Sequence, residues 1–242
     1  MGWRWLVISF TAISLQGVAP VQAWQDWPGD WSPGRPSLAA SSEAEPYLIT
    51  AQVFRLDVPF RTQKDGSRWQ SSNCGPATLG MVLDAFGVVG QATDDLRFRS
   101  HSYQGTVGIR TGTALQHIAH VAEDFGIPTV GLYNDASLFN NWSLNDIRGQ
   151  LRLGRPVMPL VRLYMLPGYE NSLPRWGHYI LLTGTSDNDF FYNDALQIDA
   201  ASGSARIISA EQLERAMQFS HIPGQAVAFG GPGLAHLAVW TP

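Results

Sequence analysis

The stretch Ser71-Ser72-Asn73-Cys74-Gly75-Pro76-Ala77-Thr78-Leu79 holds the only cysteine of this 242-residue chain. Ser72 or Asn73 can cap a helix, and Pro76 suits a first helical turn. Cys74 therefore lies at the expected start of a helix, where the helix dipole lowers the pKa of a thiol and favours the reactive thiolate. With one cysteine, an intramolecular disulfide is excluded, so this sulfur is either a small buried apolar group or a nucleophile.

Apolar positions continue this helix to about Phe86, and Gly87 suits its end. The apolar positions recur at helical spacing, so we expect this helix to pack against the core. They are Leu79, Val82, Leu83 and Phe86.

The composition is that of one globular domain with a tail. Apolar residues make up 45%, and charged residues 15%, with a net charge of -4, against about 25% charged residues in an average chain. No basic run occurs, so a nucleic acid partner is not indicated. We expect a monomer without a cofactor, acting on a peptide or protein substrate.

Residues 1–23 are predicted to be a signal peptide. Arg4 is the only basic residue before an apolar stretch from Trp5 to Leu15, which is too short to span a bilayer. Cleavage is expected after Ala23, which would make the protein secreted or periplasmic. An uncleaved membrane anchor is the alternative interpretation.

Residues 24–47 are predicted to be a flexible tail rich in tryptophan, proline and serine, followed by the folded domain at 48–242. Trp24, Trp27 and Trp31 could contact sugar rings or the cell envelope. A passive tail is the simpler interpretation, because the segment has no helical or strand period.

The domain is expected to place helices before antiparallel strands, which is an α+β fold. A polar loop is predicted for residues 94–112, between the helix that begins at Cys74 and a second helix. The helices cover residues 74–86, 113–125, 143–154 and 210–217. The strands cover residues 51–60, 128–133, 156–163, 178–183, 189–193, 227 onward and 234–240.

A thiol enzyme needs a base within reach of the sulfur and a third group that orients the base. His178 opens a buried strand, and the next strand ends at Asn193 and Asp194. A turn centred near Ser186 would place His178 opposite Asp194 in a hairpin, although the register could slip by one or two residues. Asp194 would then fix the tautomer of the imidazole and stabilise its charged form.

The other histidines suggest less chemistry. His117, His120 and Asp124 have a spacing that could hold a metal. The apolar positions of the same helix form its buried face, so we expect this trio to face solvent and bind none. No zinc, phosphate or dinucleotide motif is present.

An oxyanion donor is also required. Backbone amides at the helix start, including that of Cys74, can supply one hydrogen bond. A glutamine could supply the second, and both Gln63 and Gln70 precede the cysteine. Gln63 follows the strand end at residues 58–60, which would anchor it better.

Five segments of the chain, taken in order, resemble the family thirty-nine type of cysteine peptidase. This family includes the leader-removing domains of bacteriocin exporters and free-standing relatives with a papain-like fold. The resemblance implies N-terminal helices packed on a C-terminal antiparallel sheet. It also implies that Cys74 is the nucleophile, His178 the acid and base, Asp194 the orienting residue and Gln63 the oxyanion donor. The segments that carry it are residues 58–63, 73–79, 154–157, 177–179 and 193–194.

One departure is Ala195, where such relatives often carry proline after the aspartate. No transporter segments follow in these residues, so a role in clearing double-glycine leaders during export is not implied. The main hypothesis is an exported thiol hydrolase that cleaves a peptide or amide bond. Two alternatives remain open, a catalytically silent binding module of the same fold and a transglutaminase-like acyl transferase.

Overall fold

A computed structural model of the chain describes residues 52–172, 176–230 and 239–240. The predicted signal peptide (1–23), the tail with its three tryptophans (24–47) and the start of the domain at residue 48 lie outside the described residues. Most of the strand expected at 234–240 lies outside them as well. In the part described, none of the helices combines the length and the apolar character that a bilayer span requires.

Six α-helices are described. They are α1 (Cys74–Ala85), α2 (Thr93–Gln104), α3 (Leu115–Asp124), α4 (Leu144–Arg152), α5 (Ala200–Gly203) and α6 (Ala210–Gln218). The 3-10 turn η1 (Gln70–Ser72) precedes α1, and the 3-10 turn η2 (Leu163–Met165) follows strand β3. Ser143 begins α4 with a capping box, since its side chain accepts from the Asp146 amide and Asp146 accepts from the Ser143 amide.

The strands form one antiparallel sheet with the central order β2-β8-β3-β5-β1-β9. Strand β4 pairs with β3, and β6 joins β5 to β7. The strands are β1 (Phe54–Leu56), β2 (Thr129–Val130), β3 (Val157–Arg162), β4 (Gly177–Tyr179), β5 (Leu181–Thr185), β6 (Asp189–Asn193), β7 (Arg206–Ser209), β8 (Ala226–Phe229) and β9 (Val239–Trp240).

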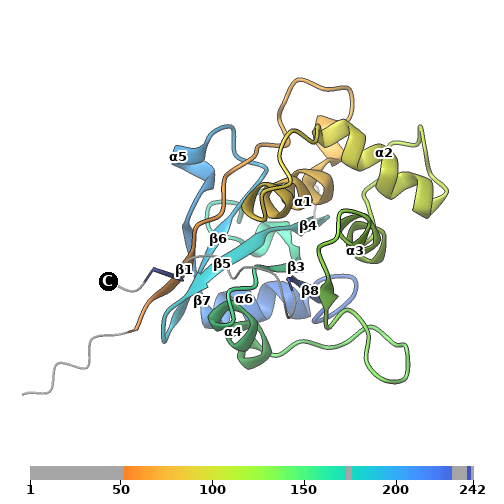
Figure 1. Cartoon of the computed structure of the whole chain (residues 1–242). Helices are drawn as coiled ribbons and strands as arrows, with labels where there is room; N and C mark the ends of the chain where they lie inside the picture. The colour runs from red at the N-terminus through yellow and green to blue at the C-terminus, as the bar shows by residue number, and fades with distance from the viewer. Residues whose placement is uncertain (1–51, 173–175, 231–238, 241–242) are drawn as a thin grey trace, which may run out of the picture. The chain divides into compact units, whose positions relative to one another are not determined.

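Helices α1, α2 and α3 pack on one another at one side of the sheet, and α1 contacts β4 directly (Figure 1). Helices α4 and α6 contact other strands, chiefly β5 and β3. Because it is enclosed by helices and sheet, α1 is buried over the whole run Gly75–Leu83, rather than on the single face that we expected. The predicted α+β arrangement of early helices on an antiparallel sheet is confirmed.

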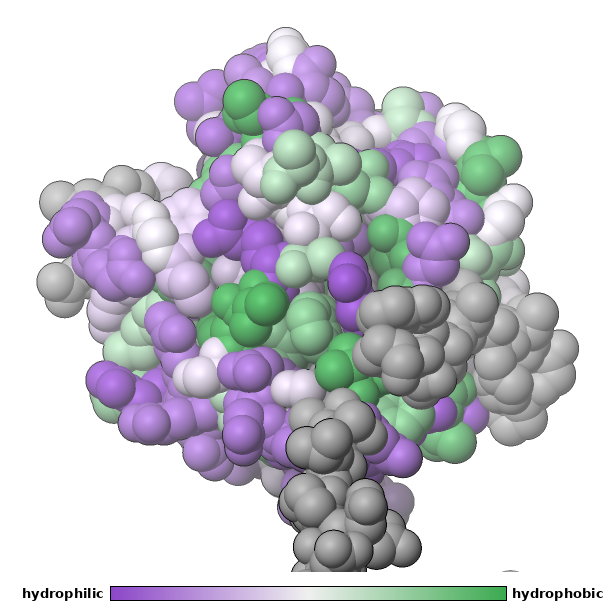
Figure 2. Space-filling view, turned by 90° about the vertical axis from the view of Figure 1, so that its left-hand side faces the viewer, coloured by the Kyte–Doolittle hydropathy of each residue, from purple (hydrophilic) through white to green (hydrophobic). Residues whose placement is uncertain are grey.

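The face seen in Figure 2 carries mostly hydrophilic residues, with apolar residues in separate patches. The apolar core lies instead between the elements. Its largest fully buried aromatic side chains are Phe190, Tyr192 and Phe229 on β6 and β8.

The prediction of a polar loop at residues 94–112 is wrong, because most of this segment is helix α2. Asp94 and Asp95 lie in its first turn, where negative charge is favourable, and Gly105 ends it in the left-handed conformation. The buried side of α2 contains Arg97 and His101 beside Leu96. A buried face with this polarity has no apolar period to detect.

The predicted strand 178–183 is divided into β4 and β5 at Ile180, and the register prediction is wrong. His178 pairs with Val161 of β3, while Leu181 pairs with Asn193 of β6. An irregularity between Leu182 and Gly184 shifts the β5–β6 register further. The ladder therefore does not place His178 opposite Asp194, and their contact depends on side chains.

Candidate active site

Cys74 is the first residue of α1, as the sequence indicated, but the cap differs from the expectation. Asn73 occupies the N-cap position and makes no side-chain capping bond. Its buried amide instead donates to Asp94 Oδ1 at 3.0 Å and accepts from Arg97 at 3.2 Å. The residue before the cysteine is thus fixed by α2 rather than by its own helix.

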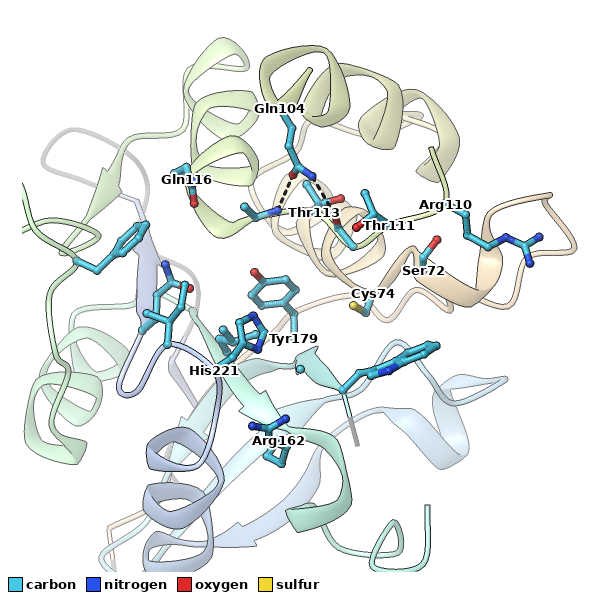
Figure 3. Close-up of a pocket in the computed structure, with 18 of the residues that line it drawn as sticks. Ser72, Cys74, Gln104, Arg110, Thr111, Thr113, Gln116, Arg162, Tyr179 and His221 are labelled. Atoms are coloured by element: carbon cyan, nitrogen blue, oxygen red, sulfur yellow. Dashed lines mark hydrogen bonds between the residues drawn. The ribbon is translucent and has the colours of Figure 1, made fainter. Parts of the chain in front are cut away.

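A pocket of about 890 Å³ opens beside the cysteine. Figure 3 shows the sulfur of Cys74 at its wall, among Ser72, Thr111 and Tyr179, which also line it. Arg162 and His221 lie on the other side of the pocket. The sulfur is therefore reachable by a ligand.

His178 and Asp194 form a buried pair. The ring nitrogen Nε2 of His178 lies 2.8 Å from Asp194 Oδ1, and both side chains are almost fully inaccessible to solvent. Because Nε2 is occupied by the carboxylate, Nδ1 is the nitrogen that can serve the Cys74 side chain, with which His178 also hydrogen-bonds. The structure brings Cys74, His178 and Asp194 together in the expected order.

The second oxygen of Asp194 has a partner that sequence reasoning missed. Tyr169 Oη donates to Asp194 Oδ2 at 2.7 Å, and Gln197 Nε2 donates to Tyr169 Oη at 2.6 Å. Tyr169 lies in the loop between η2 and β4. No local signal in the sequence ties a tyrosine in that loop to a carboxylate 25 residues later.

The electrostatics of the three groups are coupled. Burial would raise the pKa of the Cys74 thiol, but the hydrogen bond and charge of His178 and the backbone amides of Tyr179 and Gly75 lower it below its ordinary value. Burial would lower the pKa of His178, yet Asp194 and Cys74 raise it to about 10. Burial opposes ionisation of Asp194 as well, and its bonds to His178, Tyr169 and the Leu196 amide keep its pKa low. The site thus favours a thiolate beside an imidazolium.

Gln63 is buried next to the orienting loop. Its backbone amide donates to Ala195 O at 2.7 Å, and its Nε2 donates to Gln70 O at 2.7 Å. The Oε1 atom is buried without a hydrogen-bond partner among the described residues. Ala195, at the position of the departure noted above, thereby links Gln63 to the loop of Asp194, and Gln63 stays a prediction as oxyanion donor.

The His117, His120 and Asp124 trio is divided among other contacts. His120 lies 3.6 Å from Glu123, and Asp124 accepts from the hydroxyl of Tyr103 at 2.9 Å. Within residues 52–172, 176–230 and 239–240, no group of three metal-binding side chains is found.

A thiolate, an imidazole and a carboxylate in this order, on helices packed against an antiparallel sheet, define a papain-like cysteine-type peptidase. The chain belongs to the Peptidase_C39 like family, whose sequence profile matches residues 55–226. No curated protein matches the sequence.

Solved structures with a similar fold include a proposed C39-like peptidase from Bacillus anthracis, 15% identical, with a TM-score of 0.50 over 74% of this chain and 98% of that chain. The peptidase domain of Streptococcus ComA, a bi-functional ABC transporter, is 21% identical, with a TM-score of 0.44 over 66% and 92%. A double glycine motif protease from an AMS/PCAT transporter, solved with its leader peptide, is 16% identical, with a TM-score of 0.43 over 74% and 96%.

Proposed function

We propose that this peptidase is exported and hydrolyses a peptide or amide bond through a thioacyl-enzyme. The observation that carries the proposal is the His178–Asp194 pair next to Cys74. Asp194 and Cys74 raise the pKa of the imidazole, and the hydrogen bond and charge of His178 lower that of the thiol, which favours the charged forms of the nucleophile and the acid.

In the proposed reaction, the Cys74 thiolate attacks the carbonyl carbon and forms a tetrahedral intermediate. The His178 imidazolium gives its proton to the leaving amine, the carbon–nitrogen bond breaks, and a thioester to Cys74 remains. Neutral His178 then takes a proton from water, which attacks the thioester; the carbon–sulfur bond breaks, and the carboxylic acid leaves with the Cys74 thiolate and the His178 imidazolium restored. Asp194 holds the imidazole through both steps.

Gln63 and the first turn of α1 are the proposed oxyanion donors. The first amides of a helix have no partner within it, so they can point at a developing negative charge. The Nε2 group of Gln63 has two hydrogens, and one of them is directed to Gln70 O. The second is the hydrogen that would serve the oxyanion.

Alkylation of Cys74 tests the proposed ion pair. Iodoacetamide should label the wild type quickly at pH 7, and His178→Ala should slow labelling by at least about tenfold. His120→Ala, which alters an exposed histidine on α3, is the matched control and should label like the wild type. Labelling of the wild type that begins only near the free-thiol pKa of about 8.5 would contradict the proposal.

A peptide library tests turnover. Cleavage by the wild type and none by Cys74→Ala is the expected result, with mass spectrometry as the readout. Fast labelling without cleavage would instead favour the silent binding module. Products that carry an added primary amine would favour acyl transfer.

Export is tested separately through the N-terminus. After expression with its leader in a bacterial host, the mature protein should begin at Trp24 and occur outside the cytoplasm. A protein that keeps residues 1–23 and sediments with membranes would favour the anchor.

A further inference from the structure

A buried arginine lies behind the cysteine, outside the three groups already described. Arg97 on α2 is 4% exposed. Its Nη1 faces three acceptors, Ser72 O and Oγ at 3.3 Å and Asn73 Oδ1 at 3.2 Å. Its Nη2 donates to Ile109 O at 2.9 Å and Thr111 O at 3.0 Å.

These acceptors belong to two segments of the chain that meet beside Cys74. Ser72 and Asn73 directly precede Cys74, while Thr111 lies on the segment after α2, and both Ser72 and Thr111 line the pocket (Figure 3). One guanidinium therefore joins the segment before Cys74 to the neighbouring segment at Thr111 on the same side of the pocket (Figure 3). A lysine has no planar fork of five donors and could not hold both.

The charge of Arg97 is retained although it is costly to bury. The ring of Trp69 lies 4.9 Å from its guanidinium carbon, and Asp94 is bonded to Asn73 within the same network. Burial lowers the pKa of Arg97, whereas the charges of Asp94 and of the Cys74 thiolate raise it. Because Arg97 is attracted by the thiolate, the thiolate is stabilised by Arg97.

We propose that Arg97 is a positioning residue of the peptidase, which fixes the segment before Cys74 against the pocket wall and stabilises the thiolate with a permanent positive charge. This inference rests on the proposed function, since it assigns a role around the same nucleophile. The titratable groups around this part of the site are His178, Asp94, Arg97 and His101, and the pocket beside it is also lined by Arg110 and Arg162.

The test is the pH dependence of iodoacetamide labelling in full-length protein, which needs no known substrate. Arg97→Met and Arg97→Gln remove the charge, and the midpoint of labelling should rise by about 0.5–1 pH unit. Arg97→Lys keeps the charge, so its midpoint should stay nearer to that of the wild type. Arg99→Met is the matched control, because Arg99 is exposed on the same helix and lies over Phe125, and it should leave the midpoint unchanged.

Thermal unfolding is measured on every variant. Midpoints for Arg97→Met and Arg97→Gln that equal those of the wild type and Arg99→Met would overturn the proposal. Loss of folding in all three Arg97 variants would also overturn it, since Arg97 would then be a residue of the fold alone. Slow labelling of the wild type itself is a different result, because it contradicts the proposed function and leaves no activated thiolate for Arg97 to stabilise.

Discussion

The hydroxyl of Tyr169 donates a 2.7 Å hydrogen bond to Oδ2 of Asp194, the oxygen that does not contact His178. The other oxygen, Oδ1, lies 2.8 Å from His178 Nε2 and accepts from the Leu196 amide at 3.0 Å. The carboxylate is therefore fixed from both sides. A rigid carboxylate can orient an imidazole only along one direction, which here is toward Cys74.

Replacing Tyr169 by phenylalanine should loosen this carboxylate. Tyr169→Phe leaves Oδ2 of Asp194 and the amide of Gln197 without their partner. A hydrogen bond to a charged group contributes about 1.5–3 kcal/mol, and the free energy of unfolding should fall by that amount in a denaturant titration. The labelling rate of Cys74 at pH 7 should fall several-fold.

Tyr103→Phe is the matched control for this change, because Tyr103 also donates to a carboxylate, that of Asp124, but on the surface. It should alter the free energy of unfolding by less than about 0.5 kcal/mol. Equal effects of the two substitutions would show that the Tyr169 bond has no special part in the site.

Removing the charge of Asp194 should uncouple the histidine from the thiol. Asp194→Asn preserves size but no longer stabilises the imidazolium, so the pKa of His178 should fall and that of Cys74 should rise. We expect labelling at pH 7 to slow by about 10²-fold and to recover above the free-thiol pKa of about 8.5. Asp187→Asn, in the exposed turn between β5 and β6, should label like the wild type. Unchanged labelling of Asp194→Asn at pH 7 would contradict this role.

The sequence located this histidine and carboxylate although it misplaced their register. Both residues follow from where buried strands begin and end, which apolar runs mark clearly. The break at Ile180, after which the chain passes from pairing with β3 to pairing with β6, and the irregularity between Leu182 and Gly184 have no such signal. The side chains of His178 and Asp194 then make a contact that the backbone ladder does not.

Helix α2 illustrates the opposite limit. Its buried side carries Arg97, Ser100 and His101. Arg97 and His101 bond to carbonyls and hydroxyls outside the helix, whereas Ser100 donates to Leu96 O within it. A polar face of this kind is stabilised by tertiary hydrogen bonds, and these cannot be deduced from hydrophobic periodicity. The features that position Cys74 most closely were for this reason absent from the sequence prediction, whereas Cys74 itself was evident from its place before a helix.

The buried pair should make stability depend on pH in a definite direction. The folded-state pKa of His178 lies above its ordinary value of 6.5, so its contribution is complete below about pH 6.5 and is lost as the pH rises toward 10. The pKa of Asp194 is lowered from 3.8, so its contribution is present above that pH and is lost in stronger acid. The stabilisation is therefore greatest between about pH 4 and 6.5.

Two proteins isolate this effect, Cys74→Ala and Cys74→Ala with His178→Gln, because neither has a titrating thiol. The difference between their free energies of unfolding should reach about 3–5 kcal/mol in the acid window and shrink toward pH 10. Denaturant titrations at pH 5, 7 and 9 measure it. A difference that is constant or that grows with pH would be inconsistent with a raised histidine pKa.

A side chain added at Gly75, directly after Cys74, should destabilise the protein. A Cβ at Gly75 would lie 2.6 Å from Ile118 Cδ1 and 3.3 Å from Tyr179 Cδ2, so the Ile118 side chain or α1 itself would have to shift. Gly75→Ala should lower the free energy of unfolding by about 1–3 kcal/mol through overpacking. It should also slow labelling of Cys74, because the backbone amide of Gly75 stabilises the thiolate.

The clash can be relieved at its other partner. Ile118→Val removes Cδ1 itself and alone should cost about 0.5–1.5 kcal/mol. The double variant should therefore be more stable than the sum of the two single losses by about 1 kcal/mol or more, a coupling that denaturant titrations of all four proteins measure. Gly149→Ala is the matched control, since Gly149 lies inside α4 with nothing within 4 Å of an added Cβ. Gly149→Ala should stabilise the protein by about 0.5–1 kcal/mol. If the losses for Gly75→Ala and Ile118→Val were additive, the close packing of α1 on α3 would not be what excludes a side chain at Gly75.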